Sequence, residues 1–198
     1  MAQAGAGSTV QAVSDEQLIQ SVADGDPSCL ATLFERHHRG VFRFLLQMLK
    51  QRELCEDLVQ DVFLKVLRKA GRYRGEGTFK AWLYCIARNV ALDQLSRAKR
   101  HACEALDEDD LPRPLSDQRS AERAAAGKQD VNRVLQALAK LPAAVQEVIW
   151  LGRFEFDNYE ELGRALDCNA GTARVRMHRA MALLKATYTN MHGVPVDG

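Results

Sequence analysis

The sequence predicts an all-α protein with two small helical domains joined by an acidic, flexible linker. Apolar residues recur at helical spacing before residue 100 and again after residue 131, which is typical of amphipathic helices. Between them, residues 101–130 hold eight acidic and four basic residues, two prolines and few bulky apolar side chains, a composition typical of a linker. We therefore expect a first domain at residues 14–100, a second at residues 131–190, and flexible tails at residues 1–13 and 191–198.

The composition argues against several classes of protein. The five cysteines form no CxxC pair and no even set, so we expect reduced thiols in a cytoplasmic protein. No run of 18 or more apolar residues occurs, so no membrane span is expected. The adjacent His37 and His38 point to different faces of a helix and are poor joint metal ligands. We expect neither a metal nor a cofactor.

Two helices are expected before residue 50. Ser14 and Gln17 form a capping box that opens the first, which closes near Gly25. Asp26 can cap the second, because the Pro27 that follows is tolerated at a first helical position. Its apolar residues make this helix the expected centre of a bundle: Leu30, Leu33, Phe34, Val41, Phe42, Leu45, Leu46 and Leu49.

A third helix has one apolar side and one polar side. The apolar stripe, which must face a core, consists of Leu54, Leu58, Val62 and Val66, widened by Val59, Phe63 and Leu67. The residues outside this stripe are Asp57, Gln60, Asp61 and Lys65.

A glycine- and arginine-rich turn, RYRGEGT, leads into a fourth helix capped by Thr78. Residues 65–100 carry a local charge of about +8. Cations for a nucleic-acid backbone and aromatic rings for unstacked bases are what a single-strand binder needs. The candidate rings are Tyr73, Phe79, Trp82 and Tyr84. The alternative is that the aromatics are core residues and the arginines form a solvated face.

The second domain is predicted to end in a helix-turn-helix. One helix is lined by Val134, Leu135, Leu138 and Leu141, and the next, after Pro142, by Val145, Val148, Ile149 and Leu151. Asn158 then opens NYEELGRALD in a second capping box with Glu161, and Asn169 can cap the long helix AGTARVRMHRAMALLKATY. The second helix of such a pair enters the DNA major groove.

This long helix has a packed side and an outward basic side. At about 100° per residue, the packed sector holds Ala173, Met177, Ala180 and Leu184. Opposite or beside it lie Thr172, Arg174, Val175, His178, Arg179 and Ala182. No carboxylate occurs between Gly171 and Lys185, so the outward surface suits DNA.

The segments quoted carry a specific resemblance. DLVQDVFLKVLRK, RYRGEGTFKAWLYCIARN and LDQLSR resemble the second conserved region of bacterial RNA polymerase sigma factors of the extracytoplasmic-function group. LPAAVQEVIWL and NYEELGRALDCNAGTARVRMHRA resemble the fourth region of the same family. Two matched regions in the right order, with an acidic linker between them, make coincidence a poor explanation.

The resemblance implies three sets of site residues. Those facing the clamp helices of the largest polymerase subunit would be Asp57, Gln60 and Asp61. Those holding a flipped base of the −10 element would be Tyr73, Arg74, Gly75, Glu76, Gly77, Thr78 and Asn89. For the −35 element, bases would meet Arg174, Val175, His178 and Arg179, and phosphates would meet Thr172, Arg176 and Lys185.

The expected function is non-catalytic: binding of core RNA polymerase and promoter DNA, with an anti-sigma factor as a further partner that the family implies. A conventional helix-turn-helix regulator is the alternative, although it would not need the block at residues 57–97. An enzyme is less favoured, because no paired carboxylates, glycine-rich phosphate loop or nucleophile with its base is evident.

Overall fold

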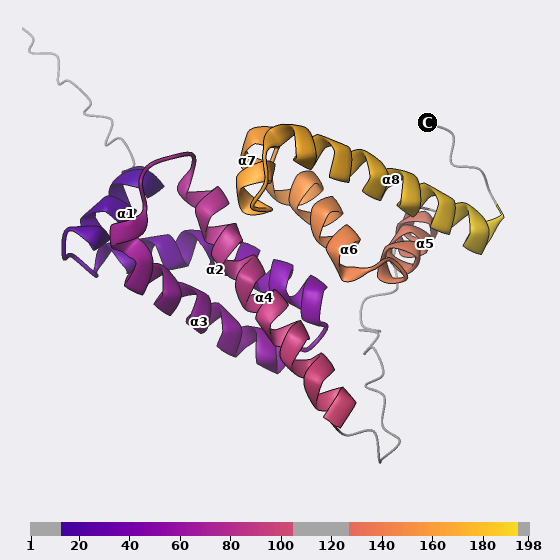
Figure 1. The fold of residues 1–198 in the computed structure, drawn as a ribbon, viewed down its shortest axis with the longest axis horizontal. Helices are drawn as coiled ribbons and strands as arrows, with labels where there is room; N and C mark the ends of the chain where they lie inside the picture. The colour runs from indigo at the N-terminus through magenta and orange to yellow at the C-terminus, as the bar shows by residue number, and fades with distance from the viewer. Residues whose placement is uncertain (1–12, 105–126, 194–198) are drawn as a thin grey trace, which may run out of the picture.

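A computed structural model describes residues 13–104 and 127–193, and every regular element in those two ranges is helical (Figure 1). The elements are α1 (Asp15–Ala23), α2 (Cys29–Leu49), α3 (Arg52–Lys69), η1 (Ala70–Arg72), α4 (Phe79–Glu104), α5 (Gly127–Ala139), α6 (Ala143–Trp150), η2 (Leu151–Glu155), α7 (Tyr159–Ala165) and α8 (Ala170–His192). The predicted all-α class is confirmed. Helices α1–α4 form a first body and α5–α8 a second.

The core of the first body lies where α2, α3 and α4 meet. Leu33, Val41 and Leu45 of α2 are fully buried, as the apolar pattern predicts. The ring of Phe44, outside that predicted set, is also fully buried and packs edge-on against Tyr84 of α4, with ring centroids 5.7 Å apart. The other predicted core residues of α2 are half-buried at the edge of the core: Leu30, Phe34, Phe42, Leu46 and Leu49.

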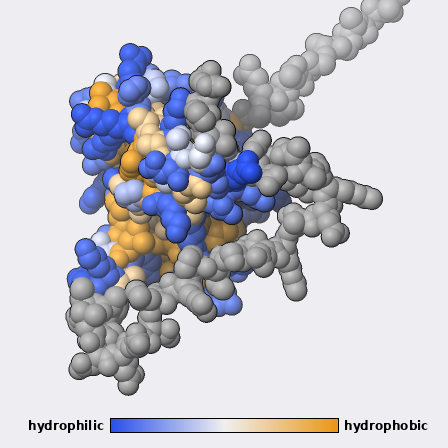
Figure 2. Space-filling view, turned by 90° about the vertical axis from the view of Figure 1, so that its right-hand side faces the viewer, coloured by the Kyte–Doolittle hydropathy of each residue, from blue (hydrophilic) through white to orange (hydrophobic). Residues whose placement is uncertain are grey.

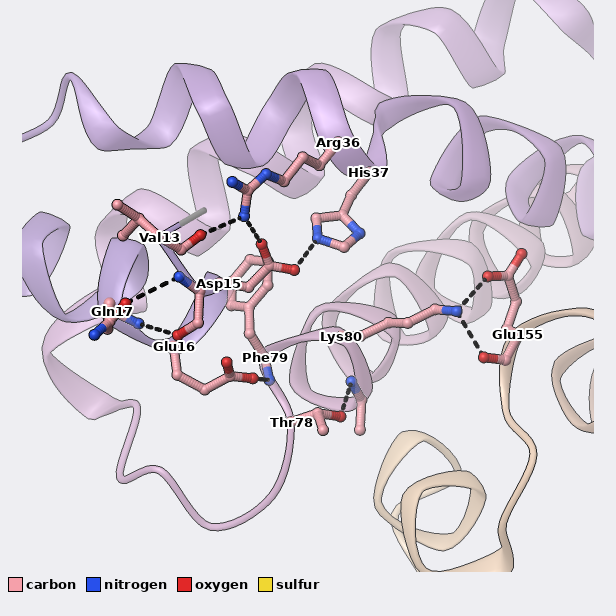
Figure 3. A network of polar contacts seen from close by, with 12 residues as sticks. Val13, Asp15, Glu16, Gln17, Arg36, His37, Thr78, Phe79, Lys80 and Glu155 are labelled. Carbon is pink, nitrogen blue, oxygen red and sulfur yellow. Dashed lines mark hydrogen bonds and ion pairs between the residues drawn. The ribbon is translucent and has the colours of Figure 1, made fainter. Parts of the chain in front are cut away.

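Helix α1 contacts the start of α4 through Glu16 (Figure 3). The predicted capping box is confirmed, since Gln17 N donates to Ser14 Oγ at 3.2 Å and Ser14 N to Gln17 Oε1 at 3.0 Å. Glu16, which directly precedes Gln17, accepts a hydrogen bond from Phe79 N at 3.0 Å. Thr78 caps α4 as predicted, with Ala81 N donating to its Oγ1 at 3.3 Å. Four orphan amides open each helix, so these side chains fix where α1 and α4 begin.

The helix-turn-helix of the second body is held by two asparagine caps. Asn158 Oδ1 accepts from Glu161 N at 2.8 Å, and Asn169 Oδ1 accepts from Thr172 N at 2.7 Å. For Asn158 the reciprocal bond of the predicted capping box is not among the contacts of the described residues. In the turn, a Cβ built on Gly163 would lie 2.7 Å from the carbonyl oxygen of Cys168. Glycine is therefore required there by the close approach of the two backbones.

Three helix ends differ from the predicted boundaries. α4 continues to Glu104, four residues beyond the expected linker start at residue 101, and α5 already begins at Gly127 rather than near residue 131. α8 ends at His192. The apolar pattern fades before these ends, yet no proline follows Arg97 until Pro112, so helix-forming residues carry α4 onward. The middle of the predicted linker, residues 105–126, lies outside the described residues, as do residues 1–12 and 194–198.

Val134 and Leu135, predicted to line one helix face with Leu138 and Leu141, do not join the core. They are 42% and 51% exposed, whereas Ala137, Leu138 and Leu141 are buried. Helix α5 packs against α8, while Val131, Val134 and Leu135 leave part of its apolar surface exposed. Figure 2, viewed from the side on which α5 and α8 lie in Figure 1, shows apolar surface among hydrophilic side chains.

Candidate nucleic-acid interface

Helix α3 presents an acidic, polar strip opposite its buried side. Asp57, Gln60 and Asp61 are all exposed, and helical spacing places them on one face. Leu64, 47% exposed, lies on the same face one turn further along. An exposed leucine beside carboxylates suits contact with another protein. Sequence reasoning did not single out Leu64, although its spacing from Gln60 places it there.

The stripe predicted for α3 is confirmed for Leu58, Val59, Val62, Phe63 and Val66, all of which are buried. Leu54 is half-buried, and Leu67 is 37% exposed rather than part of the core. A stripe of seven apolar residues is wider than the surface that α2 and α4 cover. Leu54 and Leu67, at the edges of the stripe, therefore stay partly exposed.

The loop at residues 73–78 has a defined shape. Gly75 and Gly77 have φ angles of +70° and +100°, which favour glycine. The Tyr73 hydroxyl donates to the Gly77 carbonyl at 2.9 Å, and Gly77 N donates to the Gly75 carbonyl at 2.9 Å. Arg74, Gly75 and Glu76 are exposed. Tyr73, Gly77 and Thr78 are half-buried. The structure thus brings together six of the seven predicted pocket residues.

Asn89 does not join them. It is exposed on α4, ten residues after Phe79, and at about 1.5 Å per residue its backbone lies roughly 15 Å along the helix from the loop. Its amide contacts Cys85 Sγ at 4.0 Å.

The aromatic residues near the loop fall into two pairs. Phe79 and Tyr84 are buried in the core, so the core alternative holds for them and they offer no face to a base. Tyr73 and Trp82 are half-buried, with ring centroids 5.4 Å apart, beside the loop. Burial, and then the charge of Glu16, raises the pKa of the Tyr73 phenol.

Helix α8 is packed on the predicted side. Ala173, Met177 and Ala180 are buried, and Leu184 is half-buried against the core. The predicted DNA-reading residues point outward and are exposed, apart from a half-buried Thr172: Arg174, Val175, Arg176, His178, Arg179 and Lys185.

One member of this set has a partner that sequence reasoning missed. The guanidinium of Arg174 lies over the ring of Tyr159, 5.2 Å from its centroid. A hollow of about 620 Å³ between the start of α7 and α8 is lined by both residues and by His178. Such a cation–π contact restricts the arginine before it meets any ligand.

Within residues 13–104 and 127–193, no three histidine, cysteine, aspartate or glutamate side chains gather as metal ligands would. In the same ranges, no helix combines the length and the apolar character that a membrane span requires. His37 is instead paired with Asp15, Nε2 to Oδ2, at 2.6 Å.

Two family models match the chain, each over one helical body. The model described as Sigma-70 region 2 matches residues 33–101, and the model described as Sigma-70, region 4 matches residues 132–184. The first match includes α3, the 73–78 loop and nearly all of α4, and the second includes the helix-turn-helix.

Curated relatives share most of their length with this chain. RNA polymerase sigma factor CarQ of Myxococcus xanthus is 34% identical over 165 residues, which cover 82% of this chain and 90% of CarQ. RNA polymerase sigma-H factor of Pseudomonas aeruginosa is 28% identical over 172 residues, covering 84% of this chain and 89% of that protein.

Solved structures share the fold. The sigma factor RpoE of Bartonella quintana, crystallised with the anti-sigma factor NepR, is 25% identical with a TM-score of 0.62, covering 79% of this chain and 94% of RpoE. CnrH, solved in complex with the cytosolic domain of CnrY, is 23% identical with a TM-score of 0.61, covering 87% of this chain and 95% of CnrH.

Proposed function

The chain belongs to the sigma-70 family of RNA polymerase sigma factors, in its extracytoplasmic-function group, and we propose that it recruits core RNA polymerase to a two-part promoter. Members of this family are transcription initiation factors rather than enzymes, so no catalytic residue is assigned. The observation that carries the proposal is the pairing of both family regions, in order, with an acidic surface on the first and a basic helix on the second. Because the polymerase and the promoter are in the cytoplasm, this chain would act there.

The polymerase-binding surface is the face of α3 that carries Asp57, Gln60 and Asp61, with Leu64 at its end. The partner is the clamp-helix segment of the largest subunit. Exposed carboxylates steer a basic partner and set its register, whereas an apolar side chain at the centre of a contact supplies affinity. This face is free of the neighbouring helices, since the buried side of α3 already contacts α2 and α4.

The −10 element would be held by the loop at residues 73–78. Its two glycines bring the backbone close to a ligand, and Tyr73 and Trp82 lie beside it with part of their rings accessible. Extruding a base costs a few kcal/mol, which a shaped pocket and surrounding cations offset. Asn89 would contact another nucleotide of the same strand, given its position along α4.

The −35 element would be read by α8 in the major groove. Arg174, Val175, His178 and Arg179 would face base edges, and Thr172, Arg176 and Lys185 would face phosphates. An arginine that reaches guanine O6 and N7 contributes about 1–3 kcal/mol of discrimination. The α8 amino terminus, capped by Asn169, adds a favourable dipole for phosphate.

An anti-sigma factor is the further partner we propose. RpoE of Bartonella quintana was crystallised with such a factor, and that protein and this chain share a fold over most of their lengths. A protein that covered the α3 face would prevent core polymerase from binding to it.

The test is binding of fluorescently labelled chain to core polymerase. Asp61→Lys should weaken binding at least tenfold, because it places a cation on an acidic docking face. The matched control is Asp24→Lys, an acid-to-base change at the exposed C-cap of α1, where a cation suits the helix dipole. Equal polymerase affinity of the two variants would contradict the assignment of the α3 face. Failure of the wild-type chain to bind core polymerase at all would leave a conventional helix-turn-helix regulator as the better account.

A further inference from the structure

Two carboxylates at the start of α1 bind that helix to α2 and to α4 (Figure 3). Asp15 Oδ1 lies 2.6 Å from Arg36 Nη1, and its Oδ2 lies 2.6 Å from His37 Nε2. Glu16, the following residue, accepts the hydrogen bond from Phe79 N at 3.0 Å. A single turn of α1 therefore joins the middle of α2 to the first residue of α4.

Helix α1 contacts the elements on both sides of the 73–78 loop. These are η1, which ends at Arg72 just before the loop, and α4, which begins at Phe79 just after it. Leu18, Ile19 and Val22 bury the apolar side of α1 in the core of the first body. This helix is thus a fixed support against which the two ends of the loop are placed.

The ion pairs of Asp15 hold this support in one orientation. The side chains of Asp15 and His37 are only 22% and 14% exposed, so solvent screens their pairing less than that of a surface pair. Arg36 Nη1 also donates to the Val13 carbonyl oxygen at 2.9 Å, which fixes the chain just before α1. With Asp15 held in this way, the neighbouring Glu16 carboxylate has a defined position.

Phe79 carries this position into the aromatic rings beside the loop. Its ring is fully buried, with its centroid 5.5 Å from that of His37. On the loop side, its centroid lies 6.4 Å from the Tyr73 ring and 6.1 Å from the Trp82 ring. Because the backbone of Phe79 is bonded to Glu16, a shift of that carboxylate would move all three rings together.

Glu16 also occupies the amino end of α4. Four amides there have no partner within the helix, and Thr78 Oγ1 accepts from one of them, Ala81 N. Glu16 accepts from another, Phe79 N. A free helix amino terminus attracts phosphate, whereas this one already holds a carboxylate. A DNA strand at the loop is therefore favoured to contact it through a base rather than through its backbone.

Building on the proposed function, we propose that Glu16 is a positioning residue for −10 recognition. Fixed on α2 through Asp15, it holds the Phe79 amide and so sets the shape in which the 73–78 loop receives an extruded base. Glu16 does not touch the nucleotide and acts through Phe79 and Tyr73. The Sigma-70 region 2 match begins at residue 33, so α1 lies before the segment that this family model covers.

The test is binding of a single-stranded −10 oligonucleotide by the reconstituted holoenzyme. The strand comes from a promoter that the holoenzyme uses, and each base is removed in turn as an abasic site. Removal of the captured base should weaken wild-type binding about fivefold or more. Glu16→Ala should bind the intact strand about fivefold more weakly and show less than a twofold effect of the abasic site. Affinity for core polymerase and for a −35 duplex should not change.

Two further variants separate the reach of the Glu16 side chain from its charge. Glu16→Asp keeps the charge but is one methylene shorter, so it should lose the bond to Phe79 N and behave like Glu16→Ala. Glu16→Gln keeps an oxygen that can accept this bond and should retain at least half of the wild-type abasic effect. The matched control is Asp24→Ala, which removes an acid from the other end of α1, where it accepts from Gln20, and should behave as wild type.

A purely structural role of Glu16 predicts a different result. A destabilised domain would bind the intact and the abasic strands more weakly by the same factor. Equal abasic effects in wild type and Glu16→Ala would therefore overturn the positioning role and leave the −10 assignment of the loop intact. Absence of any abasic effect in wild type would overturn both. Circular dichroism checks the helix content of each variant, and if Glu16→Ala loses it, Glu16→Asp decides by the same comparison.

Discussion

Replacing Gly77 by alanine tests the −10 pocket most sharply, because the backbone there is incompatible with an L side chain. Its φ of +100° lies in a region that residues with a Cβ rarely adopt, at a cost of about 1–3 kcal/mol. The same residue accepts the Tyr73 hydroxyl and donates to Gly75. A loop that relaxes to relieve the strain therefore loses both bonds, and the pocket loses its shape.

The added methyl group would also meet the side chain of Arg164. That side chain is long and flexible, so it can move away at little cost, and the backbone strain decides the outcome. A penalty of about 1–3 kcal/mol corresponds to a factor of roughly 5 to 150.

The assay is open-complex formation by the reconstituted holoenzyme, followed by the fluorescence of a base analogue in the −10 element. We expect Gly77→Ala to lower the fraction of open complex 5-fold or more, with unchanged affinity for core polymerase. Gly71→Ala is the matched control, since Gly71 lies just before the loop with no positive φ and nothing within 4 Å of an added Cβ. Open-complex formation that is equal in the two variants would refute the reasoning.

Four further predictions concern the recognition helix and the core. Asn169→Ala removes the side chain that accepts a hydrogen bond from Thr172 N, and should lower the free energy of unfolding by about 1 kcal/mol. The melting temperature and the affinity for a −35 duplex should both fall. The control Asn190→Ala, at an exposed position of α8, should change neither. Burial raises the pKa of Cys55 to about 11, so its thiol should resist alkylation at pH 8 in the native chain. For the same reason, stability should fall as pH rises from 9 to 11, because the unfolded thiol, with its ordinary pKa of 9.0, loses its proton first, and Cys55→Ala should remove that part of the slope. Arg179→Ala should weaken −35 duplex binding by about 1–3 kcal/mol and leave polymerase affinity intact; equal loss on a scrambled duplex would count against a base contact.

Local features were predictable from the sequence because local chemistry decides them. The caps at Ser14, Thr78 and Asn169 lie where a short polar side chain precedes an amphipathic run, and all three form. The packed side of α8 follows from angular spacing alone, and Ala173 and Met177 are buried as expected.

Features that depend on a distant partner were not predictable in this way. The burial of Tyr84 depends on α2 and on Phe156 of the second body, and the exposure of Val134 depends on which side of α5 meets α8. A signal for the contact between the bodies did exist in the sequence. Glu147 is the lone acid within the apolar run LPAAVQEVIWL, and a carboxylate in that position needs a cation from elsewhere.

Specific initiation in a purified system tests the central claim most directly. Core RNA polymerase and a library of promoter fragments are incubated with and without the purified chain, and the start sites of the transcripts are mapped. The account predicts that defined start sites arise only when the chain is present, downstream of a shared two-part motif. If core polymerase with the chain begins at no defined site, the account is contradicted.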